Sequence, residues 1–214
     1  MVLKKIKDLD ARDERKRRLF FKEAVILNDT NHRNIVKFLG LCPDPCSLML
    51  EYLCFDFAPF DGYTTVSTLG DFLTCLNDNG LVHSFPFQLQ IAAQVSSGLA
   101  YLHQANIAHR DLKPANVLVS NQHYCHLDKE SIAEIFATTP IICKLTDFGE
   151  SRSDVVQTAT FCNQSTVNVY RGSPVYMAPE IFNESTQFSA SFDDLKAVDM
   201  WALGMVFFIL LNPD

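Results

Sequence analysis

Four polar side chains in two short strings supply the groups that could do chemistry in this sequence. Asp111, Lys113 and Asn116 bring a carboxylate, an ammonium group and an amide within six residues, between an apolar stretch and a β-branched run. Asp147 adds a second carboxylate at the end of another strand-like run. Catalytic groups usually lie on loops that a rigid core positions. The two strings therefore predict one polar site at the edge of a core.

Carboxylate and amide oxygens are the donors that a hard cation such as Mg²⁺ prefers. Phosphoryl transfer needs such a set, because its barrier is lowered mainly by alignment and by cations that meet the developing charge. The residue types in the two strings therefore point to metal-assisted phosphoryl transfer.

The seven cysteines do not form a recognisable metal or disulfide framework. Their number is odd, their spacing is irregular and the N-terminus shows no apolar signal region, so we expect reduced thiols and a cytoplasmic protein. Two Cys/His groups are alternatives for a zinc site, but neither has the paired spacing of zinc ligands. They are Cys42 and Cys46 near His32, and the group His123, Cys125 and His126.

Periodicity and turn residues predict the elements that must position the polar groups. Strands are expected at Val2–Ile6, Ile35–Leu41, Ser47–Leu53 and Ile141–Thr146. Helices are expected at Arg12–Asn28, Leu69–Leu76, Phe87–Gln104, Asp128–Phe136 and Val198–Leu211, with loops at Phe55–Thr68 and Ser151–Arg171. Strands and one helix fill the first part and helices dominate afterwards, which favours an α+β fold with a small lobe followed by a mainly helical lobe.

Three of the expected helices carry further predictions. Ser84–Asn106 contains no charged residue, so its helix is expected to be buried nearly all round. Met200–Leu211 is an apolar run of 12 residues. A membrane span needs about 20, so we expect a buried core helix and no membrane span. In the small helix at 128–136, Ser131 and Glu134 have the spacing of a capping box.

The composition indicates a globular protein without general affinity for nucleic acid. Of the 214 residues, 48% are hydrophobic and 20% charged, and the formal net charge is −7. Nucleic-acid binding requires a basic surface, which this balance does not favour. The one basic cluster, Arg12–Lys22, is interrupted by acidic residues and is expected to be a solvated helix face.

Taken in chain order, six segments resemble those of the eukaryotic protein kinase family. They are Val2–Lys5 (lysine strand), Glu23–Leu27 (regulatory helix), His109–Asn116 (catalytic loop), Asp147–Gly149 (magnesium motif), Ala178–Glu180 (end of the activation segment) and Asp199–Gly204 (anchoring helix). One such match occurs by chance, whereas six in order do not. The resemblance implies the two-lobe kinase fold, with residues 1–53 as a partial β-rich lobe and 54–214 as a partial helical lobe.

The resemblance also implies the catalytic roles. Asp111 would accept or orient the proton of the substrate hydroxyl, and Lys113 would steady the charge on the transferring phosphoryl group. Asn116 and Asp147 would hold Mg²⁺. Asp199 would hold the backbone of the catalytic loop.

The resemblance implies that residues from both parts of the chain bind the nucleotide. Lys4 would contact the α- and β-phosphates of ATP and pair with Glu23. The hinge would run from Glu51 to Leu53, with backbone groups that meet adenine, after Leu50 as gatekeeper. A buried spine would link the two lobes through Leu27, Phe38, His109 and Phe148. Ordinary surface roles remain the alternative for Lys4, which has Lys5 beside it, and for Glu23.

The acceptor is expected to be Ser or Thr of a protein substrate. Lys113-Pro114 after Asp111 resembles Ser/Thr kinases, and Ser173 stands where a bridging hydroxyl is expected. The segments Glu51-Tyr52 and Ile35–Gly40 resemble tyrosine kinases, which suggests the tyrosine-kinase-like group of Ser/Thr kinases. Arg110 would pair with a phosphate added by an upstream kinase. The candidate positions for that phosphate are Thr158, Thr160, Ser165 and Thr166.

The sequence departs from the family in several places. It begins at the lysine strand without a Gly-rich loop and ends after the anchoring helix, so we expect a partial domain of low stability and weak activity, with the Glu180 carboxylate stranded. Ser120–Pro140 and Phe55–Phe60 are extra lengths, and the three Phe of the second are expected to pack on the domain. The alternative functions are an inactive kinase-like scaffold and a small-molecule kinase, and Ala178–Glu180 disfavours the latter.

Overall fold

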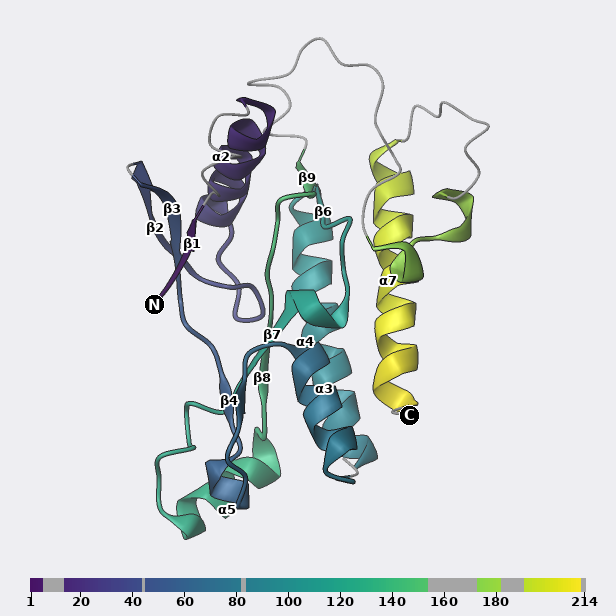
Figure 1. The fold of residues 1–214 in the computed structure, drawn as a ribbon. Helices are drawn as coiled ribbons and strands as arrows, with labels where there is room; N and C mark the ends of the chain where they lie inside the picture. The colour runs from purple at the N-terminus through teal and green to yellow at the C-terminus, as the bar shows by residue number, and fades with distance from the viewer. Residues whose placement is uncertain (6–13, 44, 82–83, 154–172, 182–190, 213–214) are drawn as a thin grey trace.

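The computed structural model describes residues 1–5, 14–43, 45–81, 84–153, 173–181 and 191–212. Figure 1 shows a small sheet with a helix beside it on one side of the molecule and a group of helices on the other. Among the described residues, no helix is both long and apolar enough to cross a bilayer.

The sheet and helix α2 come from the first quarter of the chain. Strands β1 (Val2–Lys5), β3 (Cys46–Leu50) and β2 (Phe38–Pro43) are antiparallel and lie in the order β1-β3-β2. Helix α2 (Glu14–Asp29) packs beside β2. Its buried stripe includes Phe20, Glu23 and Leu27, at the spacing of one helix face. Glu23 therefore points its carboxylate inward.

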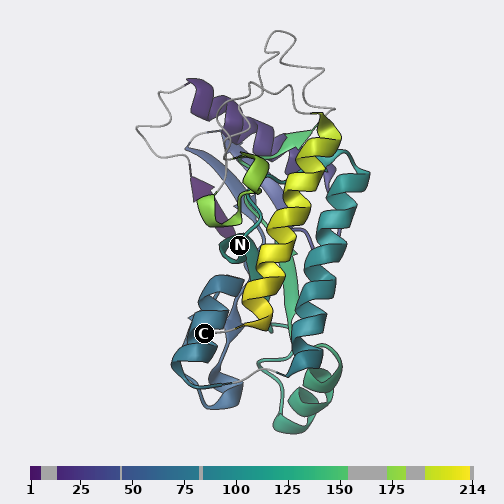
Figure 2. The ribbon, with the colours of Figure 1, turned by 90° about the vertical axis from the view of Figure 1, so that its right-hand side faces the viewer.

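Three helices pack together on the other side of the molecule. They are α3 (Leu69–Asp78), α4 (Phe85–Gln104) and α7 (Phe192–Leu211), and Figure 2 shows α4 and α7 running side by side. The hairpin of β7 (Val117–Ser120) and β8 (Ile142–Leu145) lies against α4. Short strands β6 (Ile107–Ala108) and β9 (Arg152–Ser153) pair next to it.

The hairpin is fixed to α4 and to the loop before β2 by close packing. A Cβ on Gly98 of α4 would lie 2.8 Å from the carbonyl oxygen of Asn34, closer than a real side chain approaches. That carbonyl accepts a hydrogen bond from the Leu145 amide at 2.8 Å, and the Val36 amide donates to the Leu145 carbonyl at 2.9 Å. The end of β8, two residues before Asp147, is thus held from two sides.

The segment 55–68 is not the loop that the sequence predicted. It forms a small hairpin, β4 (Phe55–Asp56) and β5 (Thr65–Val66), with a 3-10 turn at Ala58–Phe60. Phe55 and Phe57 are buried, as expected for this stretch, and Phe60 is 39% exposed. Two-residue strands give no alternating pattern, so periodicity could not find them.

Two predictions about helix burial were wrong. Helix α4 buries one stripe that includes Ile91, Val95 and Leu99, whereas Phe85 and Leu89 are exposed. Helix α7 begins at Phe192, earlier than predicted, and is buried on one face only, with exposed residues on the other. These are Met200, Trp201, Phe208 and Leu211. Absence of charge therefore did not indicate burial all round.

Two helix starts show which side chains cap them. Helix α5 (Lys129–Thr138) is capped by Asp128, whose side chain accepts from the Glu130 and Ser131 amides, so the predicted capping box of Ser131 and Glu134 was wrong. A capping box does occur at α7, between Ser191 and Asp194.

The predicted strand Ile35–Leu41 begins later than expected, at Phe38, and ends at Pro43.

Candidate active site

The loop that carries Asp111 is held by a carboxylate from helix α7. Asp199 is fully buried, and its Oδ2 accepts hydrogen bonds from the His109 amide at 2.8 Å and from His103 Nε2 at 2.9 Å. Its Oδ1 accepts from the Arg110 amide at 2.7 Å. Arg110 has a φ of +69°, a conformation that is costly for a residue with a side chain. Asp199 therefore stabilises a strained turn directly before Asp111.

Asp111 lies at the centre of a hydrogen-bonded cluster. Its Oδ2 accepts from Lys113 Nζ at 2.7 Å and from Asn116 Nδ2 at 2.9 Å. Its Oδ1 accepts from the Ser173 amide at 3.1 Å. Lys113 Nζ also donates to Ser173 Oγ at 2.7 Å, which is the expected bridge between this lysine and the hydroxyl. The three catalytic candidates and Ser173 thus form one group.

Lys4 joins the small sheet to the second carboxylate. Its Nζ donates to the two carboxylate oxygens of Glu23 at 2.7 and 2.9 Å and to Asp147 Oδ1 at 2.9 Å. Glu23 Oε1 also accepts from the Phe148 amide at 3.3 Å. Asp147 has a φ of +65°, so this motif too is held in a strained backbone conformation. The expected ion pair of Lys4 and Glu23 is present.

Charge and burial compete in this ion cluster. Burial lowers the pKa of Lys4, but the charges of Glu23 and Asp147 outweigh it, and the pKa is raised. Burial raises the pKa of Glu23, and Lys4 offsets only part of that shift. Burial likewise acts to raise the pKa of Asp147, but the Lys4 charge prevails and the pKa is lowered. The stabilisation from Asp147 is therefore present above the ordinary aspartate pKa and lost as the pH falls through the lowered value.

His109 and Phe148 connect the two strings inside the core. Both are fully buried, and their rings lie 5.3 Å apart. His109 Nε2 donates to the Thr146 carbonyl at 3.0 Å, and its Nδ1 accepts from the Asp111 amide at 3.3 Å. Both ring nitrogens are engaged by these contacts, so the imidazole links the two strings inside the core.

The β7–β8 hairpin brings Asn116 next to the motif of Asp147. The Thr146 amide donates to the Asn116 carbonyl at 3.0 Å. Asn116 Nδ2 is used by the carbonyl and carboxylate of Asp111 at 2.8 and 2.9 Å. Its side-chain oxygen accepts none of these bonds and remains a potential metal donor.

The hinge residues carry a contact that the sequence did not indicate. Glu51 Oε1 accepts from Lys144 Nζ at 2.6 Å and from the Lys37 amide at 2.6 Å. The Glu51 side chain therefore joins the sheet to strand β8. Its amide donates to the Lys37 carbonyl at 3.0 Å, so its backbone carbonyl is the group that remains for a ligand. Leu53 is buried beside it. Because Glu51 and Lys144 lie 93 residues apart, no local pattern could reveal this ion pair.

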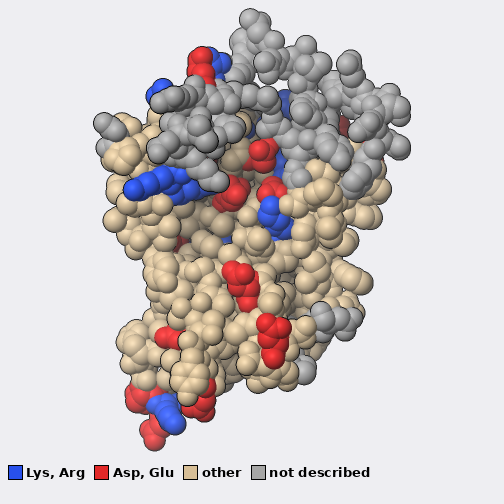
Figure 3. All heavy atoms as spheres, in the orientation of Figure 1, with Lys and Arg blue, Asp and Glu red and all other residues tan. Residues whose placement is uncertain are grey.

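Figure 3 shows acidic and basic side chains lying against one another in the upper half of the face in view, with further charged side chains lower on that face. The model of the family described as the protein kinase domain matches residues 1–214. The chain belongs to the protein kinase domain family. The sequence prediction of this family and of its α+β two-lobe fold is confirmed.

Relatives of this kinase domain include proteins named as serine/threonine-protein kinases and as mitogen-activated protein kinase kinase kinases. A probable serine/threonine-protein kinase pats1 of Dictyostelium discoideum is 29% identical over 90% of this chain, and wall-associated receptor kinase-like 10 of Arabidopsis thaliana 31% over 94%. Mitogen-activated protein kinase kinase kinase mlk-1 of Caenorhabditis elegans is 31% identical over 90%. The kinase domain spans only 5%, 22% and 17% of these relatives.

A solved structure shares the fold of this kinase domain. The crystal structure of the Rad53 kinase domain and SCD2 matches with a TM-score of 0.61 and 21% identity. The match covers 99% of this chain and 57% of that chain. At this identity the likeness concerns the fold alone.

The side chains of this kinase domain fit the Mg·ATP that the family implies. Asp147 offers a carboxylate whose side chain is 47% exposed, and Asn116 offers its amide oxygen. Both are oxygen donors, the class that Mg²⁺ prefers. Lys4 offers the ammonium group expected beside phosphates.

The remaining predictions concern the activation segment and possible metal ligands. The candidate phosphorylation positions Thr158, Thr160, Ser165 and Thr166 lie outside the described residues. Glu180 is exposed, so the expectation of a stranded buried carboxylate was wrong. Within the described residues, no three or more His, Cys, Asp or Glu side chains group as metal ligands.

Proposed function

We propose that this chain is the catalytic domain of a protein kinase that transfers the γ-phosphoryl group of ATP to Ser or Thr hydroxyls of proteins. The observation that carries the proposal is the cluster in which Asp111 accepts from Lys113, Asn116 and Ser173, with Asn116 tied through Thr146 to the Asp147 motif. Such an arrangement supplies alignment and charge, the two needs of phosphoryl transfer.

The acceptor hydroxyl meets Asp111, whose carboxylate takes its proton as the oxygen attacks the γ-phosphorus of ATP and ADP leaves with the bridging oxygen. Lys113 lies 2.7 Å from that carboxylate and stabilises negative charge on the transferring group. The bridge of Lys113 to Ser173 at 2.7 Å closes one side of this space, which favours the short acceptor side chains of Ser and Thr. Bound Mg·ATP supplies the phosphoryl group and a cation that offsets its charge.

Nucleotide binding rearranges the contacts of Lys4. In this structure its three donors are directed to Glu23 and Asp147. We infer that contact with the phosphates replaces the Asp147 bond and frees that carboxylate for the metal. The pairing with Glu23 keeps the ammonium in place, and the backbone from Glu51 to Leu53 receives adenine.

We also propose a lobe boundary between residues 53 and 54, with the sheet and α2 in the smaller lobe. Five described cysteines, Cys46, Cys54, Cys75, Cys125 and Cys143, are free thiols, which supports a reducing compartment and a cytoplasmic location. The kinase-cascade names of several relatives support an upstream activating kinase that acts on the activation segment.

The proposal is tested by phosphate transfer from labelled ATP to a mixed Ser/Thr/Tyr protein substrate. We expect transfer to Ser and Thr, and a loss of roughly 10²-fold or more in Asp147→Asn. Asp29→Asn, the same exchange at an exposed position of α2, should retain activity. If there is neither transfer nor a Mg·ATP-dependent thermal shift, the chain is an inactive kinase-like scaffold instead.

A further inference from the structure

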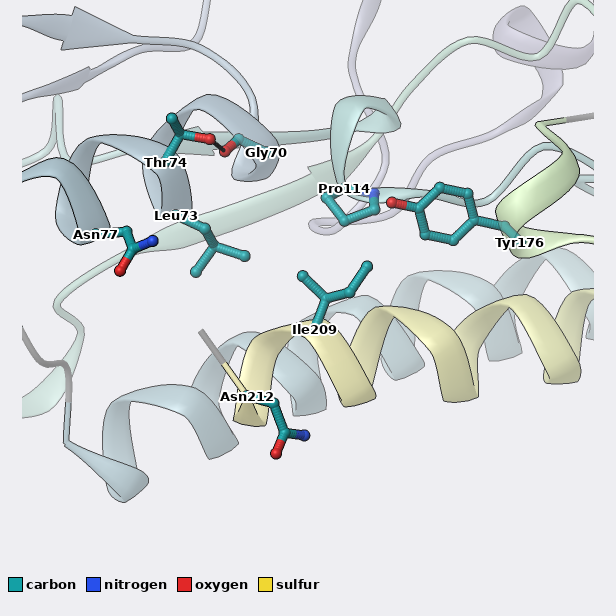
Figure 4. A pocket seen from close by; sticks show the side chains of 8 residues that line it. All are labelled: Gly70, Leu73, Thr74, Asn77, Pro114, Tyr176, Ile209 and Asn212. Atoms are coloured by element: carbon teal, nitrogen blue, oxygen red, sulfur yellow. Dashed lines mark hydrogen bonds between the residues drawn. The ribbon is translucent and has the colours of Figure 1, made fainter. Parts of the chain in front are cut away.

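A pocket opens directly beside the candidate acceptor site. It has a volume of about 380 Å³ and is lined by residues from helix α3, the catalytic loop, the segment after Ser173 and the end of α7. These residues are Gly70, Leu73, Thr74, Asn77, Pro114, Tyr176, Ile209 and Asn212. Figure 4 shows Leu73 and Asn77 on one side, Ile209 and Asn212 on the other, and Pro114 with Tyr176 at one end.

Two wall residues tie the pocket to the acceptor site. Pro114 follows Lys113, whose Nζ lies 2.7 Å from the Asp111 carboxylate. Tyr176 belongs to the turn after Ser173, and its amide donates to the Ser173 carbonyl at 2.9 Å. A peptide whose hydroxyl lies at Asp111 therefore has its neighbouring residues next to this pocket. Pockets of roughly 300–1,000 Å³ accommodate small ligands, so the space suits a large side chain.

The lining of the pocket carries no charge, since its eight residues include neither acid nor base. Leu73, Ile209 and Pro114 provide apolar walls. The Thr74 hydroxyl donates to the Gly70 carbonyl at 3.0 Å, and Asn212 Nδ2 donates to the Phe208 carbonyl at 2.8 Å, so these polar groups are partly engaged. A charged side chain placed here would lose water without gaining a counter-ion.

We propose that this pocket selects substrates with an uncharged side chain, aliphatic or amide, close to the Ser or Thr acceptor. The inference rests on the proposed function and specifies its substrate class. Leu73 and Ile209 hold the apolar part of that side chain. Asn77 lines the pocket at the exposed edge of α3 and sets the charge preference. Its amide is uncharged, whereas a carboxylate at this position would attract Lys or Arg.

A peptide array tests this inference. Each of four positions on either side of a central Ser is varied in turn, and the array is read twice, by bound protein and by transferred phosphate. We expect Leu, Ile, Met, Asn and Gln to be enriched at one position and Lys, Arg, Asp and Glu to be depleted there in both readouts. A preference for Lys, Arg, Asp or Glu at every selective position, or no selectivity in binding, overturns the inference. Selective binding without transfer retains it and contradicts the proposed function.

A single exchange tests the role of the pocket edge. Asn77→Asp keeps the size of the side chain and adds a carboxylate, so the ratio of Lys to Leu at the selected position should rise about fivefold in bound protein. Gln104→Glu makes the same exchange at an exposed position of α4 outside the pocket and should leave the ratio unchanged. An unchanged ratio in Asn77→Asp, or an equal rise in both variants, overturns the assignment.

Discussion

At the scale of single residues, the site depends on buried side chains that hold strained backbone. Arg110 and Asp147 both have positive φ, and such a conformation costs about 1–3 kcal/mol for a residue with a side chain. Asp199 accepts two backbone amides of the first turn, and Glu23 accepts the amide that follows the second strained residue. The backbone geometry at Asp111 and at Asp147 therefore depends on two buried carboxylates, Asp199 and Glu23.

Asp199→Asn tests this dependence. The amide has the size of the carboxylate but loses its charge and turns an NH₂ group toward donors, so the free energy of unfolding should fall by about 3 kcal/mol. Urea denaturation measures the change. Asp193→Asn, on the same helix with a side chain 94% exposed, should change it by less than about 0.5 kcal/mol. Equal effects of the two exchanges would show that the buried carboxylate is not needed.

At the scale of elements, the two extra lengths of sequence fold on each other. Asn121 is fully buried, and its side chain donates to the Asp56 carbonyl and accepts from the Asp56 amide, each at 2.8 Å. The Asn121 side chain thereby makes the two backbone hydrogen bonds that a neighbouring strand would make with Asp56 of β4. Phe136 of α5 packs against Phe60 of the hairpin, with ring centres 5.3 Å apart. The hairpin and α5 are thus one unit attached to the β7–β8 hairpin.

Asn121→Ala should uncouple this unit. It leaves the amide and carbonyl of Asp56 without their partner, which should lower the free energy of unfolding by about 2–3 kcal/mol and speed proteolytic cleavage within residues 55–66. Gln122→Ala, next along the chain and bonded only locally to Ser120, is the matched control and should have little effect. If cleavage of that hairpin is as slow as in the unaltered protein, the two extra lengths are independent.

At the scale of the whole molecule, the ion pair of Glu51 and Lys144 connects the sheet side to the helical side. Lys144 lies on β8, three residues before Asp147, and the same Glu51 oxygen accepts the Lys37 amide just before β2. Both side chains are largely shielded from water, at 16% and 23% exposure. The pair therefore relates the position of the metal-binding motif to that of the hinge.

A double-mutant cycle with Glu51→Gln and Lys144→Gln measures this link. We expect a coupling of about 1 kcal/mol or more in the free energy of unfolding, because the pair is shielded and shares a backbone donor. The exposed pair of Glu14 and Arg18 on α2 provides the comparison, where a cycle with the same exchanges should give at most about 0.5 kcal/mol. A coupling no larger than that of the surface pair would rule out a specific link between the two sides.

The sequence by itself determined the family, and it predicted the longer helices and the residues of the candidate site. This was possible because residue type and short spacing encode the strings around Asp111 and Asp147, and because helix and strand periodicities are local. The approximate positions of α2, α3, α4 and β8 followed from the same patterns. The roles of these site residues in catalysis stay predictions until activity is measured.

The tertiary structure alone decided how these groups are held together. The contacts of Asp199 with His103, of Asn121 with Asp56 and of Glu51 with Lys144 join residues 65 to 96 positions apart, and such contacts depend on packing and register. The exposed faces of α4 and α7 likewise depended on which neighbours pack against them, which composition does not reveal. Selection of a partner at long range is a property of the folded core, whereas the chemistry of a side chain is already present in the sequence.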